Sequence, residues 1–508
     1  MSELAGQSSG QSSDQLVNQL VNQSPSPASN QKITANEILH VDICVIGAGS
    51  GGLSVAAGAS QMGATVALVE KSEMGGDCLN TGCVPSKALL AAGHVAQSMR
   101  EAGPFGVQSH QPEVDWQQVH DHVQGVIAAI APNDSQQRFE ALGVIVIRAA
   151  GRFEDATTLR AGDQRIRAKY FVLATGSSAF VPPITGLDQI DYFTNENIFA
   201  NTTAVDHLIV IGGGPIGLEM AQAHLRLGAK VTVMEMARLL MKDDPELTTI
   251  VIDRLAAEGM VFHEGGRDLS FETTADGKVA AHCQTDAGSQ CAIGTHVLIA
   301  TGRRANVNGL NLEAAGVAFS SKGVQVDARL RTSNKRIFAI GDVAGPYQFT
   351  HMAAYQAGIV IRNMLFKLPA KVDYSAVPWV TYTDPELAHV GLSEADAVQA
   401  GRDIRVLRWQ FEENDRAQAE YRTEGMIKVI TTAKGLILGA SIVGLHAGEL
   451  IQPWILAISQ KLKIGAMAGM IAPYPTLAEA NKRIAGSFYT EKLFSKTTRA
   501  VVRFLMKF

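Results

Sequence analysis

Two cysteines beside a predicted helix carry the clearest chemistry in this sequence. Cys78 and Cys83 lie five positions apart, and the residues from Pro85 onward are typical of a helix. A turn at Gly82 would bring the two sulfurs within bonding range near the helix N-terminus, where free N–H groups and the helix dipole favour a thiolate. The spacing therefore indicates a disulfide that can open and close during a reaction.

Two other interpretations of this pair are buried thiols and half of a zinc site. Zinc sites usually combine a Cys-x2–4-Cys pair with two further ligands at similar spacing, and the sequence has no second pair. We expect the other three cysteines to be structural residues. Cys44 lies within a predicted strand as a small core residue, and Cys283 and Cys291 lie in β-like segments. We expect no resident metal.

The residues around the pair, 75–87, read Gly-Gly-Asp-Cys-Leu-Asn-Thr-Gly-Cys-Val-Pro-Ser-Lys. This stretch resembles the class I, FAD-dependent pyridine nucleotide–disulfide oxidoreductases, and dihydrolipoamide dehydrogenase and mercuric reductase more than glutathione reductase. The resemblance extends from about Val41 to about Ala485. It implies an α/β fold with two Rossmann-like dinucleotide-binding domains, for FAD and NAD(P), and an α+β C-terminal dimerisation domain in a homodimer.

The elements that must position these residues are apolar strands and helices. We expect helices at about residues 86–100 and 116–142, and strands at 65–69, 144–147, 170–175, 208–211, 231–234, 297–301, 337–342, 426–431 and 436–443. With the resemblance, they give an FAD-binding domain in two parts (39–185 and 310–371), an NAD(P)-binding domain (186–309), an interface domain (372–485) and a basic tail (486–508).

The N-terminal segment, residues 1–38, is rich in Ser, Gln and Asn and has no aromatic residue. It lacks the early basic end and apolar run of a secretory signal. We expect a disordered leader, because the segment has too little apolar surface to offset the entropy of ordering.

The first nucleotide fingerprint comprises Gly47, Gly49, Gly52 and Glu70. Strand, glycine turn, helix, second strand and terminal acid occur in the order that a dinucleotide site requires. The glycines let a pyrophosphate approach a helix N-terminus, and Glu70 can bind ribose hydroxyls. The alternative is a tight strand–helix turn without ligand.

The same pattern returns at Gly212, Gly214, Gly217 and Glu235. Gly47 to Glu70 and Gly212 to Glu235 are both separations of 23 positions. The resemblance assigns FAD to the first copy and a nicotinamide cofactor to the second. A carboxylate at Glu235 would accept from a free 2′-hydroxyl and repel a 2′-phosphate, which favours NADH over NADPH, although Arg238 could weaken that repulsion.

The resemblance also implies further cofactor contacts. Two strands end in Ala-Thr-Gly. A third strand ends at Asp342, which would bind the ribityl hydroxyls of FAD. The alternative is that Asp342 only caps the helix that follows. The implied FAD contacts are Gly76, Lys87, Thr175, Gly176, Ser177, Gly341, Asp342 and Met352, and Gly302 is implied for NAD(P).

The resemblance assigns roles in catalysis as well. Cys83 would be the thiolate beside the flavin and Cys78 the thiol that attacks substrate, with Lys87 and Glu219 as an ion pair near the ring; an exposed helix lysine is the alternative for Lys87. Pro215 replaces a tyrosine that covers the nicotinamide pocket in some relatives.

One position departs from the family pattern His-Pro-Thr-x-x-Glu. Tyr474 stands where the histidine is expected, with Glu479 at the end of the motif. A tyrosine is a poor base at neutral pH, which puts rapid disulfide exchange in doubt. Mercuric reductases resemble this chain in having tyrosine there, but their terminal Cys-Cys and Cys-x-x-Cys pairs are absent from this sequence.

The sequence thus predicts an FAD-dependent NAD(P)H oxidoreductase acting on a small disulfide, dithiol or thiophilic substrate. Alternatives are mercury(II) reduction and a slow redox-sensing flavoprotein that binds a membrane or a partner. The net charge of −5 gives no basic surface for nucleic acid, and five scattered cysteines favour a reducing cytoplasm.

The C-terminal residues add a basic stripe. Its members, three or four positions apart, are Lys492, Lys496, Arg499, Arg503 and Lys507. A helix here would be basic on one face, which indicates either peripheral contact with the inner face of a membrane or a helix packed on the dimer with a solvated basic face.

Overall fold

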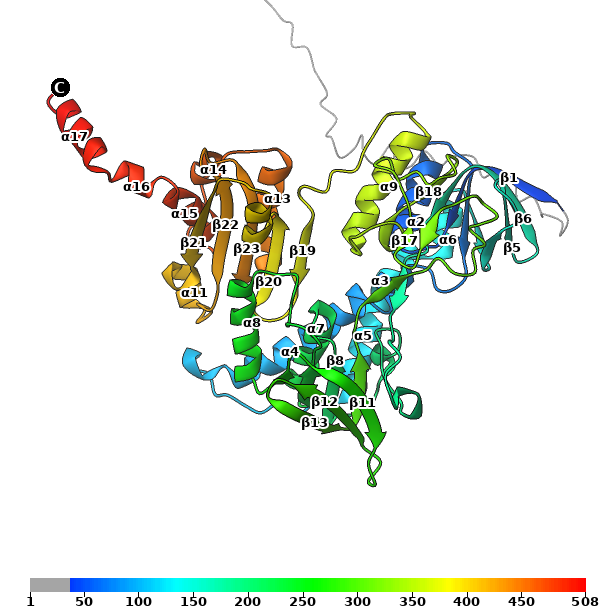
Figure 1. Cartoon of the computed structure of the whole chain (residues 1–508), viewed down its shortest axis with the longest axis horizontal. Coiled ribbons are helices and arrows are strands. Elements are labelled where there is room, and N and C mark those ends of the chain that lie inside the picture. The colour runs from blue at the N-terminus through cyan, green and yellow to red at the C-terminus, as the bar shows by residue number, and fades with distance from the viewer. Residues whose placement is uncertain (1–36) are drawn as a thin grey trace, which may run out of the picture.

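Two sheets with parallel central strands form the frame of the chain, and the first also carries two antiparallel strands at one edge (Figure 1). The computed structural model describes residues 37–508. The expected leader, residues 1–38, lies outside the described residues except for its last two, and Ile38 already begins the first strand, β1 (Ile38–Ile46).

The first sheet surrounds β1 and has the order β3–β2–β1–β6–β5–β4, with β18 also paired to β6. The bounds are β2 Val66–Glu70, β3 Val144–Arg148, β4 Gly151–Phe153, β5 Thr158–Ala161, β6 Gln164–Leu173 and β18 Ile337–Ala339. The strands β1, β2, β3, β6 and β18 are parallel, and their central residues are apolar on both faces because both faces are covered. Helices α2 (Ser50–Gln61) and α9 (Thr350–Met364) pack together over one face.

The second sheet repeats this plan in the order β10–β9–β8–β14, all parallel. The bounds are β8 His207–Ile211, β9 Lys230–Met234, β10 Val261–His263 and β14 His296–Ile299. Helix α7 (Pro215–Arg226) follows its glycine turn, and α8 (Pro245–Ala257) follows β9. A three-stranded antiparallel sheet adjoins it, formed by β11 (Arg267–Thr273), β12 (Val279–Thr285) and β13 (Gly288–Gly294).

The interface sheet is antiparallel, in the order β19–β20–β23–β22–β21. The bounds are β19 Pro378–Thr381, β20 Glu386–Gly391, β21 Ile404–Gln410, β22 Met426–Thr432 and β23 Ile437–Gly444. Its helices are α10 Glu394–Gln399, α11 Asp415–Ala419, α12 Ala447–Leu450, α13 Gln452–Ser459, α14 Ile464–Ala468 and α15 Glu479–Ser487. A separate core around Trp454 holds these elements together. The fold confirms the predicted class, α/β with two Rossmann-like units and an α+β C-terminal unit.

Two short ladders lie outside the main sheets. They pair β7 (Ser177–Ala179) with β15 (Arg303–Ala305), and β16 (Phe319–Ser320) with β17 (Gly323–Val324). The β7–β15 ladder joins the two segments that follow the Ala-Thr-Gly sequences, so it fixes the first unit against the second.

A buried lysine ties the interface sheet to α8. Lys428 on β22 is 4 % exposed, and its Nζ lies 2.6 Å from Asp244, 2.7 Å from Glu394 and 2.9 Å from Glu246. Asp244 is the N-cap of α8, where a negative charge is favourable. The ammonium group therefore joins a helix terminus of the second unit to the interface unit.

Two expected helices differ from the structure. The segment 116–142 is not one helix: α5 (Trp116–Ile130) ends before Pro132, whose missing N–H cannot continue it, and Ser135 caps a new helix, α6 (Gln136–Ala141). The helix expected at 86–100 starts earlier, because α4 (Cys83–Arg100) already includes Cys83.

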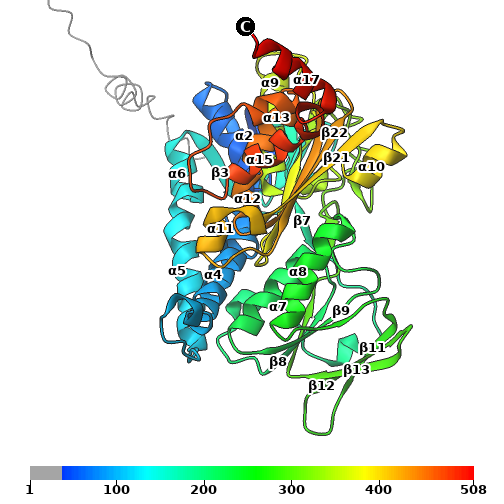
Figure 2. The ribbon, with the colours of Figure 1, turned by 90° about the vertical axis from the view of Figure 1, so that its left-hand side faces the viewer.

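Helix α4 leaves the first unit and packs against α7 of the second, with α5 alongside (Figure 2). Gly93 lies at this contact, where a Cβ would be in ordinary van der Waals contact with the backbone of Ala223, at 3.4 Å. Over residues 37–508, no helix combines the length and apolar character needed to span a bilayer.

Candidate functional site

The two cysteines lie on either side of a break between two helices. Cys78 is in the short helix α3 (Gly76–Asn80), and Cys83 is the first residue of α4. Gly82, between them, is tightly packed, because a Cβ there would lie 2.9 Å from the carbonyl oxygen of Asp77. The two thiols lie within hydrogen-bonding range of each other. The expected turn at Gly82 is therefore present.

The surroundings of the two thiols separate their pKa values. A hydrogen bond from Cys78, aided by one from Thr350 and by the charge of Lys87, lowers the pKa of Cys83 to about 6 despite partial burial. The Thr350 hydroxyl lies 3.4 Å from the Cys83 sulfur. The same interaction with Cys83, together with burial, raises the pKa of Cys78 above its usual range. These directions favour the thiolate at Cys83 and the protonated thiol at Cys78.

Lys87 forms the ion pair expected with Glu219. Its Nζ lies 2.7 Å from the carboxylate, and α4 carries it one turn beyond Cys83. Glu219 on α7 is buried and also accepts a hydrogen bond of 3.0 Å from the backbone N–H of Tyr382. The lysine lies 4.1 Å from the centre of the Tyr382 ring. These contacts hold the positive charge close to the Cys83 thiolate.

The first fingerprint leaves room for a dinucleotide. Gly52 is required by the fold, because a Cβ would lie 1.8 Å from the carbonyl oxygen of Gly47. Gly49 is not: its φ is −82° and a Cβ would meet only Gly76, at 3.9 Å. Glu70 accepts hydrogen bonds of 2.6 Å from the N–H groups of Ala48 and Ser72. The open space beside Gly49 and the α2 N-terminus suits a pyrophosphate, so this site fits FAD.

Ser177 and Asp342 meet in the same region. The Ser177 hydroxyl donates a hydrogen bond of 2.5 Å to Asp342, and burial raises the pKa of that carboxyl. Gly341 has φ +68°, which only glycine adopts without strain. The Thr175 hydroxyl donates a hydrogen bond of 2.8 Å to the Asn306 carbonyl. The next helix, α9, begins at Thr350 and includes buried Met352 in its first turn, and the Thr350 hydroxyl places its N-terminus beside Cys83.

Arg303 is a site residue that the sequence motifs did not predict. Its guanidinium group lies 3.1 Å from Asp77, 3.9 Å from Asp342 and 2.7 Å from the Ser177 hydroxyl. It therefore links the loop that contains the cysteines to the expected ribityl-binding carboxylate. The first Ala-Thr-Gly sequence is followed by Ser177 and the second by Arg303. This difference was the only local indication that Arg303 has a role in the site.

The second fingerprint has nearly the same geometry. A Cβ on Gly217 would lie 2.0 Å from the Gly212 carbonyl oxygen, whereas a Cβ on Gly214 would meet nothing within 4 Å. Glu235 accepts from the N–H groups of Gly213 and Ala237 at 2.7 and 2.8 Å. The space beside Gly302, with φ +125°, is likewise open. The residues fit a second dinucleotide, and Pro215 begins α7 at its edge.

Arg238 does not lie free beside Glu235. Its guanidinium donates to the Thr248 hydroxyl at 3.0 Å and to the carbonyl groups of Met241 and Asp243 at 3.1 and 2.9 Å. These contacts hold the arginine against the start of α8. The carboxylate therefore determines the local charge at the end of β9.

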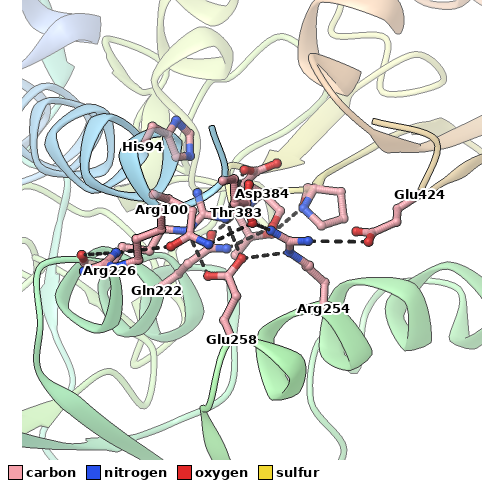
Figure 3. A network of polar contacts seen from close by, with 12 residues as sticks. His94, Arg100, Gln222, Arg226, Arg254, Glu258, Thr383, Asp384 and Glu424 are labelled. Atoms are coloured by element: carbon pink, nitrogen blue, oxygen red, sulfur yellow. Dashed lines mark hydrogen bonds and ion pairs between the residues drawn. The ribbon is translucent and has the colours of Figure 1, made fainter. Parts of the chain in front are cut away.

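A buried polar network fixes α7 against the rest of the molecule (Figure 3). Arg226, at the end of α7, makes two hydrogen bonds to Glu258 at 2.8 and 2.6 Å and lies 3.0 Å from Asp384 of the interface unit. Arg254 also contacts Glu258, at 2.9 Å. Burial and the Arg226 charge lower the pKa of His94 on α4 to about 4, so this histidine is neutral. The network holds the helix pair that carries Lys87 and Glu219.

Tyr474 and Glu479 are not brought to the cysteines within one chain. The Tyr474 hydroxyl donates to Asp415 at 2.9 Å, which raises its pKa, and Glu479 pairs with Arg483 at 2.8 Å. Helix α15, which begins at Glu479, and helix α3 lie on opposite sides of the interface sheet (Figure 1). A site that combines these residues with Cys78 needs a second subunit.

The remaining thiols are separate from this site. Cys44 is fully buried in β1, Cys283 is buried in β12, and Cys291 is exposed in β13. Cys283 faces Gln290 and Cys291 faces His282 in the β12–β13 pairing, so the two are not partners. Across residues 37–508, no three or more His, Cys, Asp or Glu side chains are grouped to hold a metal ion.

Comparisons with known proteins agree with this geometry. The family profile "Pyridine nucleotide-disulphide oxidoreductase" matches residues 41–357, and its "dimerisation domain" matches residues 377–485. The chain is 35% identical to a mercuric reductase of Staphylococcus aureus over 91% of this chain and 85% of that protein. It is 34% identical to a dihydrolipoyl dehydrogenase of Thermus scotoductus over 89% of this chain and 98% of that protein.

Among solved structures, the chain resembles the HOCl-induced flavoprotein disulfide reductase RclA from Escherichia coli. The TM-score is 0.79 at 25% identity, covering 88% of this chain and 99% of that one. Enzymes of this kind use FAD and NAD(P)H, and the match to the dimerisation domain indicates a homodimer. The chain belongs to the pyridine nucleotide–disulphide oxidoreductase family.

Proposed function

We propose that this enzyme uses NADH to reduce the Cys78–Cys83 disulfide and passes the electron pair to a small disulfide substrate. One observation carries the proposal: the Cys78 and Cys83 thiols lie within hydrogen-bonding range of each other, and this contact lowers the pKa of Cys83 and raises that of Cys78. Any two neighbouring thiols titrate at separate pKa values, so the assignment of the thiolate to Cys83 rests on the positive charge of Lys87 acting on that sulfur.

The first fingerprint and the Asp342 region would hold FAD, whose chemistry would carry the electron pair from NADH to the disulfide. The balance is NADH, one proton and the disulfide giving NAD⁺ and two thiols. Lys87 places its charge near the incoming electrons, and Thr350 donates a hydrogen bond to the Cys83 thiolate.

Cys78 then attacks the substrate after it loses its proton. It forms a mixed disulfide and releases one substrate thiol, and Cys83 attacks Cys78 to release the second thiol and restore the disulfide. Two protons end on the two product thiols. Because Tyr474 lies away from the cysteines of its own chain, we propose that Tyr474 of the partner subunit, with the partner's Glu479, completes the site.

The choice of NADH rests on Glu235. Its carboxylate accepts from the Gly213 N–H at the end of β9, and Arg238 is held by other partners. A 2′-phosphate would meet uncompensated negative charge there. Measuring kcat/KM for both nucleotides tests this, and a tenfold preference for NADPH would contradict it.

A thiophilic metal ion such as Hg(II) is the second candidate substrate. Tyr474 stands in place of the expected histidine, and mercuric reductases of several bacteria are 32% to 36% identical to this chain. Metal reduction needs thiolate ligands rather than a histidine base, so the tyrosine weakens the first candidate more than the second.

One assay panel separates these functions. NADH consumption is measured with lipoamide, oxidised glutathione, other low-molecular-weight disulfides and Hg(II), for wild type and Cys78→Ala. The proposal expects turnover of a disulfide that Cys78→Ala abolishes, while NADH still reduces the bound flavin. Turnover of Hg(II) alone would select the second candidate. Slow reduction by NADH with no acceptor turned over would indicate a redox sensor and contradict both.

For location, we propose a cytoplasmic enzyme, consistent with a catalytic thiol pair in a reducing compartment. We also infer that residues 486–508 make peripheral contact with the inner face of a membrane.

A further inference from the structure

The last helix of the chain packs on none of the domains that the structure describes over residues 37–485. Helix α17 (Lys496–Leu505) follows the short α16 (Thr490–Leu493) and projects away from the interface unit (Figure 1). The tail is therefore two helices, separated by Phe494 and by Ser495, which caps α17. None of the residues of α17 is buried. A helix of ten residues without tertiary contacts is marginal in water, so α17 needs a surface to be stable.

The two faces of α17 differ sharply. At about 100° per residue, Lys496, Arg499 and Arg503 fall within an arc of about 60°. Val501, Phe504 and Leu505 lie on the opposite side, each about half exposed or more. Leu493 and Phe494 before the helix, and Phe508 after it, add exposed apolar surface. The helix thus exposes an apolar strip that water does not favour.

The charge of the tail is opposite to that of the rest of the molecule. From Lys492 to Phe508 there are five basic residues and no acidic residue, whereas the whole chain has a net charge of −5. The rest of the chain therefore carries −10. An anionic surface repels this body and attracts the tail, which confines any contact to the tail and orients the molecule.

We propose that α17 lies in the interface of an anionic phospholipid bilayer. Val501, Phe504 and Leu505 would enter the boundary between headgroups and acyl chains, and the basic side chains would reach up to the lipid phosphates. The dimer would present two such helices, and binding of one raises the effective concentration of the other at the surface. This proposal does not depend on the substrate or on turnover.

The charge pattern favours a bilayer over a second copy of the same helix. If two α17 helices paired through their apolar strips, their basic faces would point outward into water, and no acidic residue between Lys492 and Phe508 would pair with those charges. Anionic lipid supplies both an apolar layer and negative charge at the level where the basic side chains end.

Vesicle flotation of the full-length holoenzyme tests this. The probes are vesicles of phosphatidylcholine with phosphatidylglycerol and vesicles of phosphatidylcholine alone. We expect binding to the first and little to the second, with loss in high salt. Arg499→Gln with Arg503→Gln should weaken binding by roughly fivefold per charge, and Phe504→Ser by at least about tenfold.

Matched controls separate a specific contact from general surface effects. Lys322→Gln and Ile293→Ser change exposed residues of other elements and should leave flotation unchanged. NADH oxidation should be the same in all variants, which shows that they are folded. Equal binding to both vesicles, or full binding by Phe504→Ser, would overturn the proposal. Conversion of the dimer to a monomer by Phe504→Ser would also overturn it and assign the apolar strip to the second subunit.

Discussion

Replacing Cys78 tests whether the Cys83 thiolate depends on its neighbour. A hydrogen bond from the Cys78 thiol is the largest cause of the pKa of Cys83 near 6. Hydrogen bonds to charged groups contribute about 1.5–3 kcal/mol, and a thiol is a weak donor, so the lower end applies. At about 1.4 kcal/mol per pKa unit, Cys78→Ala should raise the Cys83 pKa by about one unit.

Cys78→Ser is the matched variant. Its hydroxyl still donates to the thiolate, so the Cys83 pKa should stay near 6 or fall. Neither variant can form the disulfide, so Cys83 is always available for titration. Adding Thr350→Val to the serine variant removes the second hydrogen bond and should raise the pKa again, whereas Thr350→Ser should not.

The assay is the rate of alkylation by iodoacetamide as a function of pH. Only the thiolate reacts, so the midpoint of the rate gives the pKa, and peptide mass spectrometry separates Cys83 from the exposed Cys291. Because the pKa of Cys83 is lowered from 9.0 to about 6, the rate should persist down to about pH 6 in the serine variant. Equal midpoints for the alanine and serine variants, or a midpoint near 9 in both, would refute the reasoning.

Two further predictions concern the cofactor site and the fold. Gly214→Ala should leave the thermal unfolding temperature unchanged, because the added Cβ meets no protein atom. It should raise KM for NADH, because that Cβ points into the expected ligand space. As the control, Gly125→Ala, which is equally unobstructed but lies inside α5, should leave KM unchanged. Lys428→Met should lower the free energy of unfolding by about 3 kcal/mol and Tm by several degrees, because it leaves three carboxylates without their buried cation. As the control, Lys278→Met removes an exposed lysine and should change Tm little.

The parts of the site that short stretches of sequence determine were predictable. Both glycine fingerprints and the helix after the cysteines follow local rules of turn geometry and hydrophobic periodicity, and each is present. The break of α5 at Pro132 also had a local cause, the missing N–H of proline, and the expectation of one helix over residues 116–142 was wrong because it ignored that cause.

Other parts depend on contacts between distant segments. Arg303 reaches Asp77 across 226 positions, and no pattern in either stretch predicts that contact. Arg238 stands three residues after Glu235 in sequence, yet its hydrogen bonds direct it toward α8. The relation of Tyr474 to Cys78 depends on how two subunits meet, which the sequence of one chain does not contain.

The most direct test of the central claim is an anaerobic reductive titration of the FAD-loaded enzyme with dithionite. If Cys78 and Cys83 form a working disulfide beside the flavin, wild type takes up two electron pairs per subunit, one for FAD and one for the disulfide, and Cys78→Ala takes up only the pair for FAD. A wild-type enzyme that is fully reduced by a single electron pair would contradict the account, because the two sulfurs would then play no part in electron transfer.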